Sequence, residues 1–402
     1  MKKARLREGF TTGTSAAAAA HAAVARLLGG AAAAIPTTVD VALPPFSDDL
    51  KPPFPRLSIA IAESGTDADG SAWAAVVKDG GDDPDATHGA RIIVYAAKWA
   101  WRGGAPAGGS VIPHVFLYGG EGVGVVTLPG LPVEPGEPAI NPEPRRQISF
   151  AALEAAARYG YSGPLHLLIR VPDGLKRAKK TMNARLGIMG GISILGTHGI
   201  VKPYSVEAWK AIISQGVSVA ASLGLDTLLF STGRRSERLG FGLYPELAPQ
   251  CGVQAADFAA FAMREAAGRG FARIIWCCFP GKLLKLAQGL EWTHAKSAAV
   301  DTAMLARYAA KAGASDDLMA QITAVPTATG IFALLEKNPA VHDTVLRRVG
   351  DQAFAVLQGW LRQGPPESCC PELTLCVFRD QSLALTIFSE AKNPVTTASS
   401  SL

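Results

Sequence analysis

REGFTTGTSAAAAAHAAVARLLGG, which runs from Arg7 to Gly30, sets two glycines and four hydroxyl side chains directly before a block of alanines. Alanine is the strongest helix former, so the stretch predicts a helix over Ala16–Leu28. Thr14 or Ser15 is well placed as its N-cap. One cap needs one hydroxyl, and exposed N–H groups at a helix start beside glycines are also typical of an anion site. The stretch therefore predicts a capped helix and leaves open whether the other hydroxyls hold an anion.

The same stretch also resembles a secretory leader, because the basic residues between Lys2 and Arg7 precede the alanines. A secretory apolar region is a clean run, whereas His21 and Arg26 interrupt this one and polar residues separate it from the charges. We therefore expect the stretch to stay on the mature chain. No segment reaches about 18 strongly apolar residues, so no membrane span is predicted and a cytoplasmic location is expected.

The composition is that of a globular protein. The chain has 402 residues, of which 48% are hydrophobic and 18% charged, and this is enough for two or three domains with sizeable cores. The net charge is +5, and no Lys/Arg run is long enough to suggest a nucleic-acid partner. The small surplus suits a polyanionic small molecule. The sequence leaves homo-oligomer formation open.

The six cysteines form no CxxC pair and no zinc-type Cys/His ladder. Reduced, buried thiols in the cytosol are therefore expected. Cys369, Cys370 and Cys376 would offer three ligands to a metal, but no fourth ligand lies close in sequence, so no metal is predicted.

The first half of the chain predicts short strands joined by Gly, Pro and Asp turns. The strands are rich in β-branched or aromatic residues: Thr38–Leu43, Arg56–Ala62, Trp73–Lys78, Arg91–Tyr95, His114–Tyr118 and Leu165–Val171. A helix is predicted over Ser149–Tyr159. Prolines argue against helix and central strand in Leu43–Pro55 and Pro129–Pro144, because each proline lacks an N–H donor. The second proline segment is expected to wrap the surface in a fixed path.

The second half predicts alternating helices and strands. Helices over Ser205–Gly224 and Ala255–Gly268 are each followed by a strand, over Thr227–Ser231 and Ala272–Cys278. Helices dominate from Thr302 to about Leu361, and strands over Thr374–Phe378 and Leu383–Phe388 follow. The predicted fold class is α/β with an α+β first half. It comprises a mixed-sheet domain over residues 1–200, a Rossmann-like α/β domain over 201–392 and a disordered tail over 393–402.

Ligands of parallel sheets bind beyond the carboxyl ends of the strands. Two loops of the second half occupy such positions, FSTGRRSE (Phe230–Glu237) and CCFPGKLLKLA (Cys277–Ala287). Arginines there can grip carboxylates through two parallel hydrogen bonds. The next polar stretch, WTHAKSAAVD (Trp292–Asp301), contains His294. It implies no Ser/His/Asp triad, since no nucleophile-elbow pattern accompanies it.

Three further clusters stand out in the first half. KDGGDDPDATHG (Lys78–Gly89) could bind a hard cation or supply a base, but an acidic turn explains it as well. YGGEGVGVVT (Tyr118–Thr127) spaces glycines like a loop that approaches a nucleotide, although no convincing helix follows, so a strand bend explains it equally. LGIMGGISILGTHGIVKPYS (Leu186–Ser205) sets Thr197 and His198 in a tight turn, where His198 serves either a site or the fold.

These clusters, in this order, resemble the cobalt-precorrin-5B C1-methyltransferases of the anaerobic cobalamin pathway. The resemblance extends from about residue 5 to about residue 388. It is carried by LREGFTTGTSAAAAA, VVKDGGDDPDATHGARI, GGEGVGVVTLPGLPVEPGEPAINPEPRR, GISILGTHGIVKPYS and FPGKLLKLAQG. The chain departs from the family where Ser15 stands in place of a frequent cysteine, His198 in place of a common threonine, and STGRRSE in place of a TPGN-like turn.

The resemblance implies methyl transfer from S-adenosylmethionine to C1 of the tetrapyrrole cobalt-precorrin-5B, which gives cobalt-precorrin-6A. It also implies that the N-terminal domain resembles the ribosomal protein S5 domain 2-like fold. The substrate carries many acetate and propionate groups, so hydroxyls, arginines, lysines and helix N-termini are the expected grips. Because a sulfonium methyl group is already activated, alignment of donor and ring carbon should outweigh acid–base power.

Under this resemblance the candidate residues divide into three groups. The candidate catalytic residues are Asp82, His88 and His294. The candidate substrate-binding residues are Thr11, Thr12, Thr14, Ser15, Asp79, Arg145, Arg146, Thr197 and His198. The candidate cofactor-binding residues are Gly120, Gly122, Gly124, Thr232, Gly233, Gly281 and Lys282.

Two other function classes are weighed against the enzyme. A non-catalytic tetrapyrrole-binding or carrier protein on the same scaffold is supported by the altered STGRRSE loop alone. A kinase-like phosphate enzyme would need a P-loop lysine motif, which the chain lacks. The expected partners are the tetrapyrrole and S-adenosylmethionine.

Overall fold

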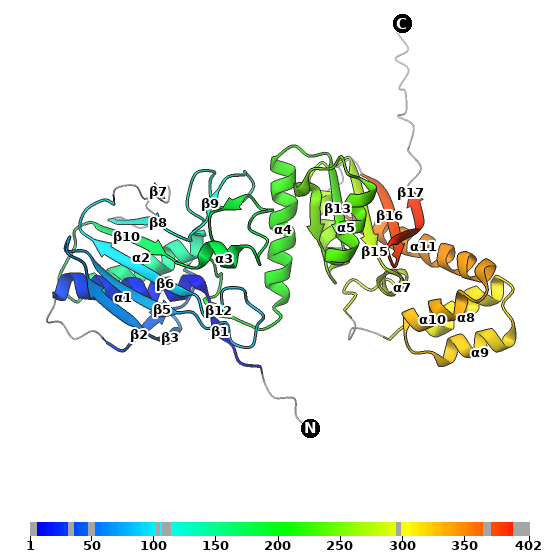
Figure 1. The fold of residues 1–402 in the computed structure, drawn as a ribbon, viewed down its shortest axis with the longest axis horizontal. Helices are drawn as coiled ribbons and strands as arrows, with labels where there is room; N and C mark the ends of the chain where they lie inside the picture. The colour runs from blue at the N-terminus through cyan, green and yellow to red at the C-terminus, as the bar shows by residue number, and fades with distance from the viewer. Residues whose placement is uncertain are drawn as a thin grey trace, which may run out of the picture. The chain divides into compact units, whose positions relative to one another are not determined.

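The computed structural model describes residues 6–30, 36–46, 53–101, 105–106, 114–294, 299–364 and 371–388. The chain divides into two compact units, Met1–Glu207 and Ala208–Leu402 (Figure 1). Each unit combines a sheet with helices, as the predicted mixture of α and β requires. The expected tail over 393–402 lies outside the described residues.

The first unit is built on a six-stranded mixed sheet in the order β4-β5-β6-β10-β8-β7. Its strands are β4 (Glu63–Thr66), β5 (Ala72–Val77), β6 (Arg91–Ala97), β7 (Ala105–Pro106), β8 (Val115–Gly119) and β10 (Leu165–Arg170). β8 and β10 are parallel, whereas β5 and β10 each lie antiparallel to β6. β5, β8 and β10 therefore share one direction, and the loops that follow them leave from the same edge of the sheet.

Two helices, α1 (Thr12–Gly29) and α2 (Pro142–Ala157), pack against one another, and α1 also packs on β5 and β6 (Figure 1). Every residue from Ala16 to Ala20 is 0% exposed. A helix that is apolar all round belongs in a core, and alanine lets its backbone come close to several neighbours at once. The hairpin of β2 (Thr38–Ala42) and β3 (Arg56–Ala60) adds Val39, Val41 and Ile59 to the same core.

Both predicted helix starts in this unit are wrong, and several strand ends differ by one or two residues. The helix predicted over Ala16–Leu28 begins at Thr12 and is capped by Thr11, not by Thr14 or Ser15. The helix predicted to begin at Ser149 begins at Pro142, inside the proline segment. Proline is tolerated in the first turn because an N–H there has no intrahelical acceptor. The rest of the proline segment is hydrogen-bonded to the first unit, with Ala139 N–H donating to the Gly124 carbonyl at 2.7 Å, and its residues Ala139 and Ile140 are buried.

Short strand pairs and one short helix complete the sheet edge. β1 (Gly9–Phe10) pairs with β12 (Ile200–Val201), and β9 (Val125–Val126) pairs with β11 (Ile188–Met189). Helix α3 (Gly174–Ala178) follows β10.

The second unit contains a five-stranded sheet in the order β14-β13-β15-β16-β17. The strands are β13 (Thr227–Ser231), β14 (Gly252–Gln254), β15 (Arg273–Cys278), β16 (Glu372–Arg379) and β17 (Ser382–Phe388). The first four in this order are parallel and β17 is antiparallel. The chain adds β14 on one side of β13 and then β15 and β16 on the other. The direction of strand addition therefore reverses between β13 and β15.

Both faces of the parallel strands β13, β15 and β16 are buried, as in other parallel sheets. Helix α5 (Arg234–Leu243) covers one face, where Leu239 packs on the cluster that contains Leu229, Cys277 and Cys376. Alternate side chains such as Phe230 and Trp276 point to the other face and are 0% exposed. The cysteines described by the structure, Cys251, Cys277, Cys278 and Cys376, are free and buried as predicted, while Cys369 and Cys370 lie outside the described residues.

The remaining helices and one 3-10 turn surround or extend this sheet (Figure 1). They are α4 (Val206–Ser222), η1 (Pro249–Cys251), α6 (Ala259–Ala267), α7 (Pro280–Ala287), α8 (Thr302–Lys311), α9 (Asp316–Ala324), α10 (Ala328–Leu335) and α11 (Pro339–Leu361). The predicted alternation of helix and strand is confirmed, although α6 begins four residues later than expected. Helix α11 packs on α6 and α7, and α10 packs on α7.

Candidate functional site

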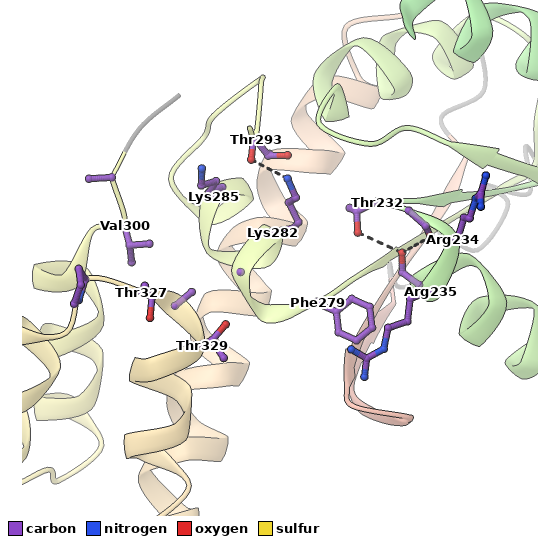
Figure 2. Close-up of a pocket in the computed structure, with 16 residues that line it drawn as sticks. Thr232, Arg234, Arg235, Phe279, Lys282, Lys285, Thr293, Val300, Thr327 and Thr329 are labelled. Atoms are coloured by element: carbon purple, nitrogen blue, oxygen red, sulfur yellow. Dashed lines mark hydrogen bonds between the residues drawn. The ribbon is translucent and has the colours of Figure 1, made fainter. Parts of the chain in front are cut away.

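A cavity of about 710 Å³ opens beyond the carboxyl ends of β13 and β15. This is the point where strand addition reverses, which is the usual ligand site of open α/β sheets. The loops after both strands line it, together with the start of α10 (Figure 2). The lining residues are Thr232, Gly233, Arg234, Arg235, Ser236, Phe279, Gly281, Lys282, Lys285, Thr293, Ala299, Val300, Pro326, Thr327, Ala328 and Thr329.

Two helices begin at this cavity. α5 starts directly after Gly233 and α7 directly after Phe279, and in neither does the N-cap side chain bond to the first turn. The first N–H groups of a helix lack intrahelical acceptors and carry partial positive charge. These two helix starts therefore offer hydrogen-bond donors to a negatively charged or carbonyl-bearing group of a ligand.

The side of the cavity near β13 carries hydroxyls and arginines. Thr232 Oγ1 lies 3.3 Å from Ser236 Oγ, which donates to the Gly233 carbonyl at 3.0 Å. The Arg235 guanidinium lies 4.7 Å from the centroid of the Phe279 ring and donates to the Asp380 carbonyl at 2.6 Å. Both arginines have exposed side chains. Stacking and hydrogen bonding fix Arg235, and this shapes the wall of the cavity beside Phe279 (Figure 2).

The opposite side carries two lysines from α7. The Lys282 ammonium forms an ion pair with Asp257 and donates to the Thr293 carbonyl at 3.1 Å. The Lys285 ammonium donates to the carbonyl of His294. Figure 2 shows both lysines beside Thr293, across the cavity from Arg235. None of the described residues that line the cavity is acidic, so this surface favours an anionic or hydrogen-bond-accepting group.

Four sequence-predicted cofactor residues meet in this cavity: Thr232, Gly233, Gly281 and Lys282. His294 lies beside it, stacked on Trp292 with ring centroids 5.1 Å apart. Sequence reasoning did not select Thr293, Thr327 or Thr329. Thr327 caps α10 by accepting from the Gly330 N–H at 3.2 Å, but nothing near it in sequence points to a site more than 90 residues earlier.

The hydroxyls of the opening stretch are buried and bonded within the first unit. Thr12 Oγ1 accepts from the Leu195 N–H at 2.8 Å, and Thr14 Oγ1 donates to the Gly199 carbonyl at 2.8 Å. Ser15 Oγ donates to the Thr11 carbonyl at 2.9 Å, and Thr11 Oγ1 accepts from the Thr14 N–H at 3.2 Å. The four side chains are at most 5% exposed. These bonds hold the start of α1 against the segment after Ser193. Each of the four hydroxyls is buried and bonded to protein groups, so none is exposed to bind an anion.

The acidic loop after β5 also forms an ion pair and a hydrogen bond with Arg7. The Arg7 guanidinium forms an ion pair with Asp79, and the Arg7 N–H donates to Asp82 Oδ2 at 2.6 Å. The hydrogen bond and charge of Arg7 lower the pKa of Asp79 despite some opposing desolvation. His88 Nδ1 accepts from the Gly80 N–H at 3.0 Å. Among the residues the structure describes, no group of three or more His, Cys, Asp or Glu is arranged to hold a metal ion.

The glycines of the loop after β8 lie against protein backbone. A Cβ on Gly122 would lie 1.8 Å from the Val171 carbonyl oxygen, and Gly122 has a φ of +73°. A Cβ on Gly124 would lie 3.0 Å from the Gly191 carbonyl oxygen, and one on Gly120 would lie 3.0 Å from a side-chain atom of Leu168. Close packing of protein segments explains these glycines without a cofactor. The strand-bend interpretation is the one these contacts favour.

The remaining predicted substrate residues differ in exposure. Arg145 is 7% exposed and donates to Glu137 at 2.6 Å and to the Ile140 carbonyl at 2.7 Å. Arg146 donates to Glu143 at 2.7 Å. Thr197 and His198 are exposed. They lie just before β12, which pairs with β1, and Phe10 of β1 donates to the Asp79 carbonyl at 2.9 Å. The two loops therefore belong to one contiguous edge of the first unit.

These features define an α/β protein with a positively charged ligand cavity where the order of its parallel strands reverses. No helix among the described residues is long and apolar enough to cross a membrane. The chain belongs to the CbiD family, which matches residues 1–203, and the CbiD C-terminal domain matches residues 292–382.

Several relatives share the name cobalt-precorrin-5B C(1)-methyltransferase. The protein of that name from Nitratidesulfovibrio vulgaris is 48% identical over 351 residues, which is 86% of this chain and 86% of the relative. The one from Geobacillus kaustophilus is 42% identical over 336 residues, 83% of this chain and 84% of the relative. A crystal structure of the cobalamin biosynthesis protein CbiD from Archaeoglobus fulgidus is 28% identical, with a TM-score of 0.36 and coverage of 70% of this chain and 79% of that one.

Proposed function

We propose that this chain is a cobalt-precorrin-5B C(1)-methyltransferase, which transfers a methyl group from S-adenosylmethionine to C1 of the ring and so gives cobalt-precorrin-6A. One observation carries the proposal: 48% identity to a protein of that name over 86% of both chains. The matched stretch is longer than either unit alone, so it extends into both. S-adenosylmethionine would supply an activated methyl group on its sulfonium.

The cavity at the reversal of strand order supports binding of the methyl donor there. S-adenosylmethionine has a carboxylate, which suits the basic lining, and hydrogen-bonding groups on its ribose and adenine, which suit the two uncapped helix starts and the hydroxyls of Thr232 and Thr327. Its sulfonium is positive, so free cations nearby would oppose binding. Two of the four basic side chains have acidic partners, because Lys282 pairs with Asp257 and Arg235 lies 3.8 Å from Asp380. Thr232, Gly233, Gly281 and Lys282 are the proposed contacts.

The tetrapyrrole is proposed to bind at the edge of the first unit, where the loops after β5, β8 and β10 leave the sheet. Exposed Thr197, His198 and His88 belong to this edge. Three lysines on or after α3 add positive charge: Lys176, Lys179 and Lys180 are exposed, and no ion pair with another described residue involves them. These lysines could form ion pairs with the acetate and propionate groups of the ring. Arg145, Arg146, Asp79 and the buried opening hydroxyls would support this edge without touching the ring.

The proposed catalytic contribution is alignment more than proton transfer. Methyl transfer from a sulfonium depends on alignment of donor and ring carbon and on exclusion of water, and such alignment can supply a large share of a rate enhancement. Asp82, His88 and His294 remain the candidates for any proton transfer. Asp82 and His88 share the loop after β5 in the first unit, and His294 belongs to the second unit.

Several finer assignments are part of the proposal. The first unit is proposed to resemble the ribosomal protein S5 domain 2-like fold and the second to be Rossmann-like, with a domain boundary near residue 200. The reversal of strand order in the second unit supports the latter. The enzyme is proposed to work in the cytoplasm, and a homo-oligomer stays a prediction.

Incubation of the full chain with methyl-labelled S-adenosylmethionine and cobalt-precorrin-5B tests the proposal. Label in the ring supports the methyltransferase. Tight binding of the tetrapyrrole without label transfer, under conditions where a relative is active, would support the carrier in its place.

A further inference from the structure

Lys285 is a buried lysine that lines the cavity of the second unit and has no carboxylate partner among the described residues. It lies in the second turn of α7 and is 7% exposed, and it lines the cavity at the strand ends. Its ammonium donates to the His294 carbonyl, and no ion pair with an acidic residue involves it among the residues described. A buried charge is expensive to keep unless an opposite charge or several hydrogen bonds compensate it.

The neighbours of Lys285 do not provide that compensation. Asp257, the acidic side chain at this wall, is already paired with Lys282. Burial lowers the pKa of Lys285, and repulsion by Lys282 lowers it further, against a smaller opposing effect of Asp257. The site is therefore short of one negative charge.

We propose that Lys285 binds the carboxylate of the amino-acid portion of S-adenosylmethionine. The inference deepens the proposed function and rests on it. A carboxylate supplies the missing charge and accepts a charge-assisted hydrogen bond, whereas the adenine and ribose are neutral and do not. The amino-acid end of the donor would then lie along the wall of Lys285 and Thr293, and the adenosine along the wall of Thr232 and Phe279 (Figure 2).

Two ligands that differ in the amino-acid portion test this orientation. S-adenosylhomocysteine has the carboxylate, and 5′-methylthioadenosine has the same nucleoside and a thioether without it. Calorimetric titration of the full chain would compare both ligands with wild type and Lys285→Met. We expect the substitution to lower the affinity for S-adenosylhomocysteine about tenfold or more, because this is the usual loss when a hydrogen bond to a charged group is removed. The affinity for 5′-methylthioadenosine should change by less than about twofold.

Lys311→Met, at an exposed lysine in the last turn of α8, is the matched control and should leave both affinities unchanged. Lys285→Gln keeps a polar end and serves as a second variant if Lys285→Met unfolds at lower temperature. Equal loss for both ligands would show a general effect on the cavity and overturn the inference. No loss for S-adenosylhomocysteine would also overturn it, because the buried ammonium would then serve another anion such as a substrate carboxylate. Failure of wild type to bind S-adenosylhomocysteine would contradict the placement of the donor itself.

Discussion

Thr12 accepts a hydrogen bond from Leu195, although 183 residues separate them in sequence. The Leu195 N–H donates to Thr12 Oγ1 at 2.8 Å, and the Thr12 hydroxyl has the carbonyl oxygens of Ser193 and Leu195, each 3.2 Å away, as acceptors for its proton. The first helix of the chain is thereby joined to the last segment of the first unit. The hydroxyls of Thr11–Ser15 are buried because they hydrogen-bond the start of α1 to the end of the first unit.

Replacement of Thr12 by valine tests this connection. Valine has nearly the same shape but removes the hydroxyl, so the Leu195 N–H loses its acceptor inside the protein. We expect the local unfolding free energy of α1 to fall by about 1–3 kcal/mol, measured by native-state hydrogen exchange of its amides. Thr344→Val removes an exposed helix hydroxyl bond to the Ala340 carbonyl and should cost less than about 0.5 kcal/mol. Equal, small effects of the two substitutions would contradict a role for Thr12 in this connection.

Gly122→Ala separates a packing role of the glycine loop from a cofactor role. Gly122 and Gly136 both have positive φ values, +73° and +91°, so alanine is strained at either position. Only at Gly122 does the added Cβ meet backbone, 1.8 Å from the Val171 oxygen, whereas nothing lies within 4 Å at Gly136. Gly136→Ala should lower the free energy of unfolding by about 1–2 kcal/mol. Gly122→Ala should lower it by a further ~1–3 kcal/mol or more, because of the clash with Val171. Thermal unfolding of both variants gives the comparison. A normally folded Gly122→Ala that binds S-adenosylhomocysteine poorly would restore the cofactor interpretation.

His21 should make the first unit sensitive to mild acid. It is 3% exposed within α1, and burial, helped by repulsion from Arg158, lowers its pKa to about 4. The unfolded chain binds a proton near the ordinary value of about 6.5, so protonation favours unfolding as the pH falls from about 6.5 toward 4. The free energy of unfolding is unaffected by this titration above about pH 6.5, and below the window it is lower by at most about 3 kcal/mol.

His21→Leu removes this titration. Its unfolding temperature should depend less on pH between about 4 and 6.5 than that of wild type. His198→Leu, at an exposed histidine, should keep the wild-type dependence. Parallel curves for wild type and His21→Leu would contradict the assignment.

Gly281→Leu should block the cavity without harming the fold. A Cβ at Gly281 would have its nearest neighbour, the Cβ of Ala328, 4.0 Å away, so the longer side chain extends into the cavity. We expect the affinity for S-adenosylhomocysteine to fall by about tenfold or more. Gly359→Leu, in α11 with nothing within 4 Å, is the matched control and should bind as wild type does. Unchanged binding by Gly281→Leu would place the methyl donor elsewhere.

Sequence reasoning succeeded where a local pattern determines local structure. The alternation of helix and strand gave the parallel sheet of the second unit. Thr232 follows β13 and Gly281 follows β15. Both line one cavity, because the carboxyl ends of parallel strands lie at the same edge of the sheet. The alanines predicted a helix for the same reason, since their helix propensity is intrinsic.

It failed where partners distant in sequence decide the outcome. Thr11 caps α1 in place of Thr14 because Thr14 Oγ1 is held by Gly199, 185 residues away. The spacing of Gly120, Gly122 and Gly124 left a nucleotide loop and a strand bend both open, and only the contacts with distant protein segments such as Val171 favour the bend. Thr327 and Thr329 reach the cavity through the packing of α10 on α7, which no short motif encodes.

The position of the transferred methyl group tests the central claim most directly. The full chain would be incubated with cobalt-precorrin-5B and S-adenosylmethionine carrying a ¹³C methyl group, and the product examined by NMR. Our account predicts one new ¹³C methyl group, bonded to C1 of the ring, together with an equal amount of S-adenosylhomocysteine. Recovery of unlabelled tetrapyrrole, or of label at a different ring carbon, would contradict it.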